Sequence, residues 1–189
     1  MLNGKFFLDR CLNSISKQTF KDYEVVISSS GKMAKNTNTA IKEAKGDIIK
    51  VLFMDDYLNH ENSLKILAEN FKGGWLATGC IHDDGRSRYN PHKPIWNDLI
   101  YAGQNTIGSP SVIAFENTKP LLFDEKLSWM IDCEYYTRMY DKYGLPTLLD
   151  DLSIAIGIGS HQTSYQMSEK EKIDEQMYAM HKYAKRKGI

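Results

Sequence analysis

Two adjacent carboxylates, Asp55 and Asp56, directly follow the apolar run "IIKVLFM". Neighbouring groups of like charge repel each other, and each loses hydration close to a core. Such a pair is tolerated where a cation lies beside it, and Mg²⁺ and Mn²⁺ prefer carboxylate oxygens. The pair therefore predicts a divalent metal site at the end of a buried strand. The alternative is an acidic first turn of a helix, which the helix dipole favours.

The first half of the chain predicts elements that could hold this pair in place. Apolar residues at helical spacing and short β-branched runs alternate along it. We expect, in chain order, a helix over 5–17, a strand over 23–27, a helix between Asn36 and Gly46, a strand over 47–54 and a helix around 64–71. This order is typical of a doubly wound sheet, in which ligands bind at the carboxyl ends of the strands. Continuous apolarity over 47–54 favours a parallel strand that is covered on both faces.

The second half predicts strands over 73–82, 109–116 and 152–159. A helix is expected to begin at Asp132 and end at Gly144, and a final amphipathic helix follows Ser168. The long connection over 86–104 is expected to be functional, because structureless loops of that length are uncommon in a compact domain. No repeat or linker interrupts the chain, so we expect one domain over 1–189.

The bulk composition excludes several classes of protein. Lys and Arg together number 24, as do Asp and Glu, and this balance argues against a protein that grips nucleic acid. No apolar run approaches the roughly 20 residues of a spanning helix, and the N-terminal segment lacks a signal-peptide pattern. The basic segment 182–188 is interpreted as the solvated end of a helix, with weak membrane attraction as the alternative. Three widely separated cysteines indicate reduced thiols and a cytoplasmic location, with the inner face of a membrane left open: Cys11, Cys80 and Cys133.

Four segments, in the expected order, resemble the family 2 glycosyltransferases. They are "LDRCLNSISKQTFKDYEVVI", "AKNTNTAIKEAKGDIIKVLFMDDYL", "FDEKLSWMIDCEYYTRM" and "GIGSHQTS". The resemblance implies an α/β GT-A fold, with a mostly parallel sheet flanked by helices and without the usual first strand. It also implies a donor side over 1–72, an acceptor side with the catalytic base over 73–165, and a C-terminal helix over 166–189.

The resemblance also assigns roles to particular residues. It implies an inverting transfer from a nucleotide-diphosphate sugar to a glycan, lipid-linked or protein acceptor, with Mn²⁺ or Mg²⁺ stabilising the departing diphosphate. The implied base is Asp132, with Glu134 as its catalytic neighbour. The other implied residues are Asp55, Asp56 and His161 for the metal, Ser29, Ser30, Lys35, Asn36 and Arg138 for the donor, and Trp129 and Ser109 for the acceptor.

The sequence departs from the family pattern at several positions, and these departures leave alternatives open. Phe53 stands where the family's first Asp would fall, and Ser29 and Ser30 stand in place of an Asp pair. The segments before Leu8 and between 31 and 36 are shorter than usual, so we expect either a fragment or a shortened enzyme. A non-catalytic sugar-nucleotide-binding or partner-binding module is the second hypothesis. A metal-dependent phosphotransferase or nuclease is the third, although its usual acidic cluster or Gly-rich phosphate loop is missing.

Overall fold

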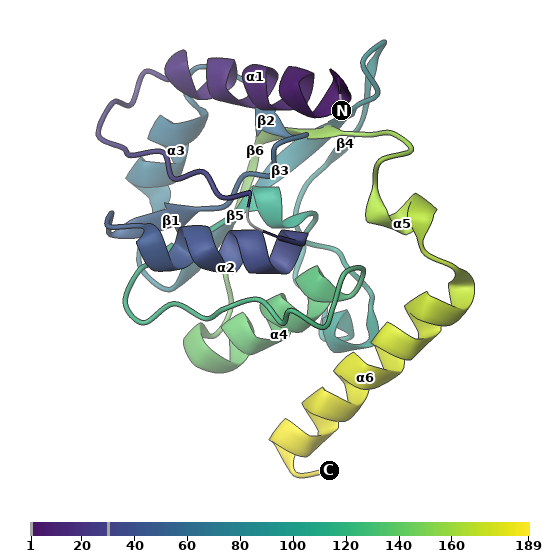
Figure 1. The fold of residues 1–189 in the computed structure, drawn as a ribbon. Coiled ribbons are helices and arrows are strands. Elements are labelled where there is room, and N and C mark those ends of the chain that lie inside the picture. Colours follow the sequence, from purple (N-terminus) through teal and green to yellow (C-terminus); the bar gives the residue numbers. More distant parts are fainter. Residues whose placement is uncertain (1, 30) are drawn as a thin grey trace.

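The computed structural model describes residues 2–29 and 31–189, and helices surround one sheet within it (Figure 1). The helices are α1 (Leu2–Ser16), α2 (Met33–Glu43), α3 (Ser63–Asn70), α4 (Ile131–Tyr143), α5 (Thr163–Gln166) and α6 (Glu169–Lys187), with short 3₁₀ turns η1 (Ile100–Ala102) and η2 (Pro110–Val112). The strands are β1 (Ile48–Lys50), β2 (Tyr57–Leu58), β3 (Trp75–Asp83), β4 (Arg88–His92), β5 (Ile113–Glu116) and β6 (Thr147–Gly157). The predicted α/β class with flanking helices is confirmed.

The sheet is mixed, with the strand order β1-β5-β3-β6-β2 and with β4 paired to β3. Within the described ranges only β3 and β6 pair in parallel, and the other pairings are antiparallel. The expectation of a mostly parallel sheet is therefore wrong. Continuous apolar runs report that both faces of a strand are covered, but they do not fix its direction.

The segment predicted as a strand over 23–27 is extended, but no described strand pairs with it. Val25 and Ile27 are 46% and 57% exposed. A carboxylate oxygen of Glu24 accepts hydrogen bonds from the backbone N–H groups of Lys45 and Gly46, at 2.5 and 2.9 Å. High β-propensity reflects packing against neighbouring strands, so without a partner the same residues remain an extended connection.

Other boundaries also differ from the prediction: the strand expected over 109–116 is limited to β5, and the strand expected over 152–159 begins earlier, as β6. The strand expected over 47–54 is limited to β1, because the chain leaves the sheet after Lys50 and turns at Phe53, whose carbonyl accepts from the Asp56 N–H at 3.0 Å. Helix α2 begins at Met33 with Lys32 at its N-cap, so Asn36 is not the cap. The side-chain amide of Asn36 instead bonds both the N–H and the carbonyl of Gly31.

The core lies around β3 and α4. Trp75 of β3 is 1% exposed, and its ring stacks on Tyr136 of α4 with a 5.8 Å separation between centroids. The Trp75 indole N–H donates to the Gly144 carbonyl at 2.9 Å, where α4 ends. Buried aromatic pairs of this kind fix one element against another, so β3 holds the middle and the C-terminal end of α4 in position.

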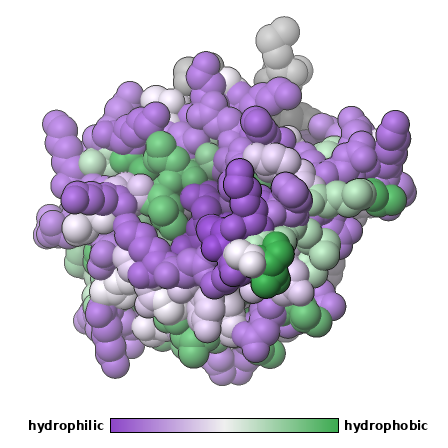
Figure 2. Space-filling model, turned by 90° about the horizontal axis from the view of Figure 1, so that it is seen from below, coloured by the Kyte–Doolittle hydropathy of each residue, from purple (hydrophilic) through white to green (hydrophobic). Residues whose placement is uncertain are grey.

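The surface carries no broad apolar area on the face shown in Figure 2, where hydrophilic residues predominate and hydrophobic ones form small separate patches. Helix α6 extends away from the sheet toward the C-terminus (Figure 1). None of the helices in the described ranges is both long enough and apolar enough to cross a membrane.

Candidate functional site

Asp55 and His161 meet at one edge of the sheet. Asp55 lies in the turn between β1 and β2, and His161 lies in the segment that follows β6. The Asp55 Oδ2 and His161 Nε2 atoms are 3.0 Å apart, and the two side chains are 24% and 35% exposed. The ring of Phe7, from α1, lies with its centroid 4.9 Å from that of His161. The structure therefore brings together two of the three predicted metal ligands and leaves both accessible to solvent.

Asp56 points into the protein and is 3% exposed. Its Oδ1 accepts a hydrogen bond from the Gly157 backbone N–H at 2.9 Å, and its Oδ2 accepts from the Ser109 hydroxyl at 3.3 Å. Burial and the neighbouring Asp55 charge raise the pKa of Asp56 to about 7, although its hydrogen bonds oppose the rise. Both carboxylate oxygens of Asp56 thus accept hydrogen bonds from other groups of the protein.

Gly157 explains how the turn and β6 fit together. A Cβ atom at this position would lie 2.2 Å from the Asp55 carbonyl oxygen, closer than real contacts allow. Only glycine permits this approach, and its N–H then reaches the Asp56 carboxylate. The close packing fixes the turn that presents Asp55 outward.

The donor set fits a divalent cation only in part. Among the described residues, no group of three His, Cys, Asp or Glu side chains is placed to hold a metal ion. Asp55 and His161 could supply two ligands. Mg²⁺ commonly keeps several waters and takes one or two carboxylates together with substrate phosphates. Two protein ligands at a partly exposed edge are compatible with that mode of binding.

Arg10 also belongs to this edge, although no pattern in the sequence indicated it. Its Nη2 donates to the Asp55 carbonyl at 2.5 Å, and its Nη1 lies 3.7 Å from a carboxylate oxygen of Asp83. The guanidinium lies 4.5 Å from the ring centroid of Tyr57, in cation–π contact. Helical spacing identified the apolar face of α1 but gave no signal for this contact.

Asp132 lies in the first turn of α4, one residue beyond its start, and Met130 occupies the N-cap. Its Oδ2 accepts from the Asn105 side-chain amide at 2.6 Å, and its Oδ1 accepts from the Cys133 N–H at 2.7 Å. Burial raises the pKa of Asp132 to about 6, against the effect of these hydrogen bonds. A carboxyl group with this pKa can accept a proton near neutral pH.

The loop over 105–109 connects the two acidic positions. Asn105 bonds Asp132, and Ser109, four residues later, bonds Asp56. Asp132 and the Asp55–Asp56 turn therefore both contact one short loop. The segment over 86–104, which we expected to be a functional connection, contains β4 and η1, and this loop follows it directly before η2.

Glu134 and Arg138 belong to a different network. Glu134 is 3% exposed and forms ion pairs of 2.7 Å with Arg138 and with Lys182 of α6. Arg138 also donates to the Leu122 carbonyl at 2.8 Å. Burial opposes ionisation, but these two cations hold the pKa of Glu134 below its ordinary value. In the described structure neither residue bonds Asp132, Asp55 or His161: Glu134 links α4 to α6, and Arg138 links α4 to the segment that carries Leu122.

The remaining predicted residues are dispersed. Ser29 and Lys35 are exposed, and Asn36 fixes Gly31 as described above. Ser30 lies outside the described residues. Trp129 is half-buried against the core, and its backbone N–H donates to Glu175 of α6 at 2.8 Å. Nothing in the sequence near Glu175 signals this long-range contact.

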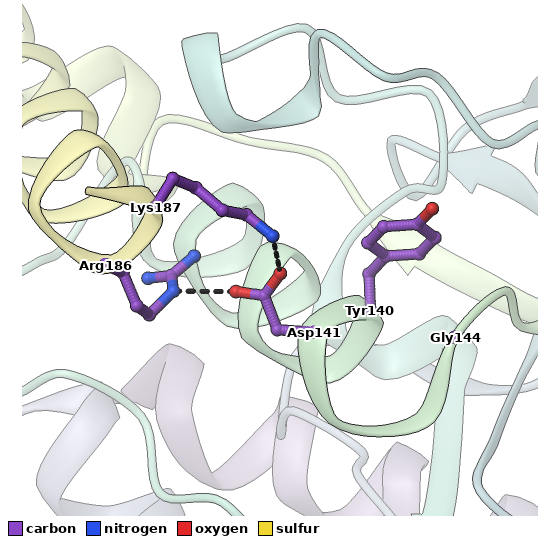
Figure 3. Close-up of a pocket in the computed structure, with 5 residues that line it drawn as sticks. All are labelled: Tyr140, Asp141, Gly144, Arg186 and Lys187. Atoms are coloured by element: carbon purple, nitrogen blue, oxygen red, sulfur yellow. Dashed lines mark hydrogen bonds and ion pairs between the residues drawn. The ribbon is translucent and has the colours of Figure 1, made fainter. Parts of the chain in front are cut away.

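A hollow of about 570 Å³ lies away from the predicted residues, between the C-terminal ends of α4 and α6. Figure 3 shows Asp141 at its wall, held by Arg186 and Lys187 at 2.7 and 2.6 Å, with Tyr140 and Gly144 nearby. Its charged groups already pair with one another. We therefore interpret the hollow as part of the contact between two helices, and the Asp55–His161 edge as the candidate site.

Comparison with known proteins bears mainly on the fold. Staphylococcus aureus TarS residues 1–349, crystallised with UDP-GlcNAc, superimposes with a TM-score of 0.68 at 17% identity over 94% of this chain. The complex of the same protein with UDP gives 0.63, also at 17% identity and 94% coverage. The chain has the fold of TarS. This fold is a glycosyltransferase fold. The chain spans 62% and 61% of the length of the two TarS chains.

Sequence comparison adds little to the TarS-like fold. No protein-family model matches the chain. A sucrose operon repressor of Pediococcus pentosaceus is 27% identical over 104 residues, which are 53% of this chain and 29% of the repressor. A match of this length and identity does not assign the chain to a family of regulators.

Proposed function

We propose that this chain is a metal-dependent glycosyltransferase of the family 2 type, which takes its sugar from a nucleotide-diphosphate donor. The observation that carries the proposal is the loop over 105–109, which links the Asp132 carboxylate to the Asp55–Asp56 turn where His161 also lies. The TarS-like fold supports it, because TarS was crystallised with UDP and with UDP-GlcNAc. The acceptor is a glycan, a lipid-linked sugar or a protein.

In the proposed reaction Asp132 acts as the general base. It would remove the proton of the acceptor hydroxyl while that oxygen attacks the anomeric carbon of the donor sugar. A single base with attack opposite the leaving group inverts the configuration at that carbon. The raised pKa of Asp132 suits this task, since a base works best when its pKa lies near the working pH.

The diphosphate leaves from the Asp55–His161 edge in this proposal. Mn²⁺ or Mg²⁺ bound there would stabilise negative charge on the departing phosphate oxygens. Asp55 and His161 would hold the cation, and Arg10 fixes the backbone carbonyl of Asp55. Asp56 contributes by holding the turn through Gly157 and Ser109.

A thermal-shift panel tests whether the chain binds such a donor. UDP, UDP-GlcNAc and other nucleotide diphosphates and their sugars are added with and without Mn²⁺. We expect at least one nucleotide to raise the melting temperature when Mn²⁺ is present, because a ligand that binds only the folded state stabilises it by mass action. His161→Ala should weaken the shift, and His181→Ala, at an exposed position of α6, should retain it. If no nucleotide shifts the melting temperature with any divalent metal, the proposal is wrong.

The second candidate is a module that binds a sugar nucleotide without turnover. The observation that favours it is Phe53, which is partly buried against the core where the family would place an acidic ligand. Both candidates predict donor binding, so measured turnover distinguishes them.

A cytoplasmic location remains part of the proposal, supported by three cysteines that are free and buried in the structure.

A further inference from the structure

We propose that Asn105 is the positioning residue for Asp132, holding its carboxylate in one orientation toward the acceptor. The inference rests on the proposed function only where it names an acceptor, because the contact between Asn105 and Asp132 does not depend on the reaction. No pattern in the sequence assigned Asn105 to the site.

The Asn105 side chain uses its full hydrogen-bonding capacity. Its Nδ2 donates to Asp132 Oδ2 at 2.6 Å and to the Gly108 carbonyl at 3.0 Å. Its Oδ1 accepts from the backbone N–H groups of Ile107 and Gly108, both at 3.0 Å. An amide has two donor hydrogens and two acceptor lone pairs, so all four are occupied. Rotating the amide by 180° would set its oxygen against the Asp132 carboxylate and its N–H groups against two backbone donors. Its orientation is therefore fixed.

The loop that carries Asn105 is itself anchored on both sides. The Tyr136 hydroxyl, from the interior of α4, donates to the Gly108 carbonyl at 3.0 Å, and Tyr136 is fully buried. His92, at the end of β4, lies with its Nε2 3.1 Å from the Thr106 carbonyl oxygen. The loop is thus held to α4 by Tyr136 and to β4 by His92, and Asn105 in turn holds the carboxylate of Asp132.

The contact leaves Asp132 able to act. Each of its oxygens accepts one hydrogen bond, from Asn105 or from Cys133, and the remaining lone pairs are free to take a proton. The titratable groups that face Asp132 are Cys133 and Tyr136, and burial raises the pKa of both, so both are neutral near pH 7. On the far side of the loop, His92 is engaged with Thr106. The Asn105 amide favours ionised Asp132, as does the Cys133 side chain.

The decisive experiment is a titration of the Asp132 carboxyl carbon by ¹³C NMR, with the signal assigned through Asp132→Asn. Asn105→Asp keeps the oxygen that accepts from Ile107 and Gly108, but it replaces the donor to Asp132 with a second carboxyl group. We expect the pKa of Asp132 to rise by about one unit or more. Asn105→Leu removes the donor without adding charge and should raise the pKa by a smaller amount.

The matched control is Asn97→Asp, which makes the same chemical change in the same connection, where Asn97 bonds Gln104 and the Leu99 N–H. It should leave the pKa of Asp132 at the wild-type value. Unfolding curves of each variant confirm that the comparison is made on folded protein. An Asp132 pKa that is the same in the Asn105→Asp and Asn97→Asp variants overturns the proposal.

Turnover provides the second readout. If the chain transfers sugar, the acid limb of its pH–rate profile should move upward in Asn105→Leu by the same amount as the carboxyl pKa, with a lower kcat and little change in the donor KM. An acid limb that stays in place while the carboxyl pKa moves would overturn the role of Asn105. Absence of turnover in the wild type would instead count against the proposed function, and the NMR titration would still decide whether Asn105 positions Asp132.

Discussion

Lys50 is an unusual residue within β1, because its ammonium lies under the loop that carries Ser111. Its Nζ donates to the carbonyls of Val51, at 2.9 Å, and of Ser111. Burial lowers the pKa of Lys50 to about 7, although the charge of Asp56 opposes this. In the unfolded chain the same amine titrates near its ordinary value of 10.5, so between pH 7 and pH 10.5 the unfolded state binds more protons.

The free energy of unfolding should therefore rise with pH above 7 through Lys50, by at most about 1.4 kcal/mol per pH unit. Lys50→Met removes the titrating group, and we expect the slope of stability between pH 7 and pH 9 to fall. Urea denaturation at pH 7, 8 and 9 measures it. Lys42→Met, at an exposed position of α2, should keep the wild-type slope. Equal slopes in the wild type and in Lys50→Met would contradict the assignment.

At the scale of single residues, the sequence predicted that Asp55 and His161 lie together, and the structure places their side chains 3.0 Å apart. The metal role of Asp55 and His161 and the catalytic role of Asp132 stay predictions. The inward orientation of Asp56 could not be predicted, because adjacent residues in a turn point in different directions that depend on the backbone. Asn105 gave no signal, since an asparagine in a loop is commonly a turn residue.

At the scale of elements, helix α6 supports the segment before α4 through the carboxylate of Glu175. The two oxygens of Glu175 accept hydrogen bonds from the backbone N–H groups of Ser128, Trp129 and Met130, at 2.8–3.0 Å. These residues lead directly into α4 and Asp132. Helix α6 therefore holds the entry to the helix that carries the proposed base.

We expect Glu175→Ala to lower the free energy of unfolding by about 2 kcal/mol or more, because hydrogen bonds to a charged group are strong and three N–H groups lose their partner. Chemical denaturation measures the loss. Asp174→Ala removes a neighbouring exposed acid and should change stability by less than about 0.5 kcal/mol. Equal effects of the two substitutions would show that Glu175 does not support α4.

Helices were predicted better than strands, for a physical reason. The apolar spacing of α1, α3, α4 and α6 is a local property, and these helices lie close to the predicted ranges. Strands depend on partners that are distant in sequence. The segment over 23–27 has the composition of a strand and no described partner, whereas β4 has a polar sequence and pairs with β3.

At the scale of the whole molecule, the sequence order of motifs carried more information than any single one. Strand direction, the loop over 105–109 and the capping role of α6 all depend on contacts between distant segments, which periodicity does not record. The turn that follows β1 and the first turn of α4 both contact that loop, through Ser109 and Asn105. The proposal that Asp132 and Asp55 form one site predicts turnover.

The most direct test of that claim is release of the nucleotide diphosphate from its sugar donor, followed with and without Mn²⁺ in the wild type and in Asp132→Asn. We predict release that requires the metal and is lost in Asp132→Asn, while that variant still binds the donor. Release that continues unchanged in Asp132→Asn, or that proceeds equally well without a divalent cation, would contradict the account.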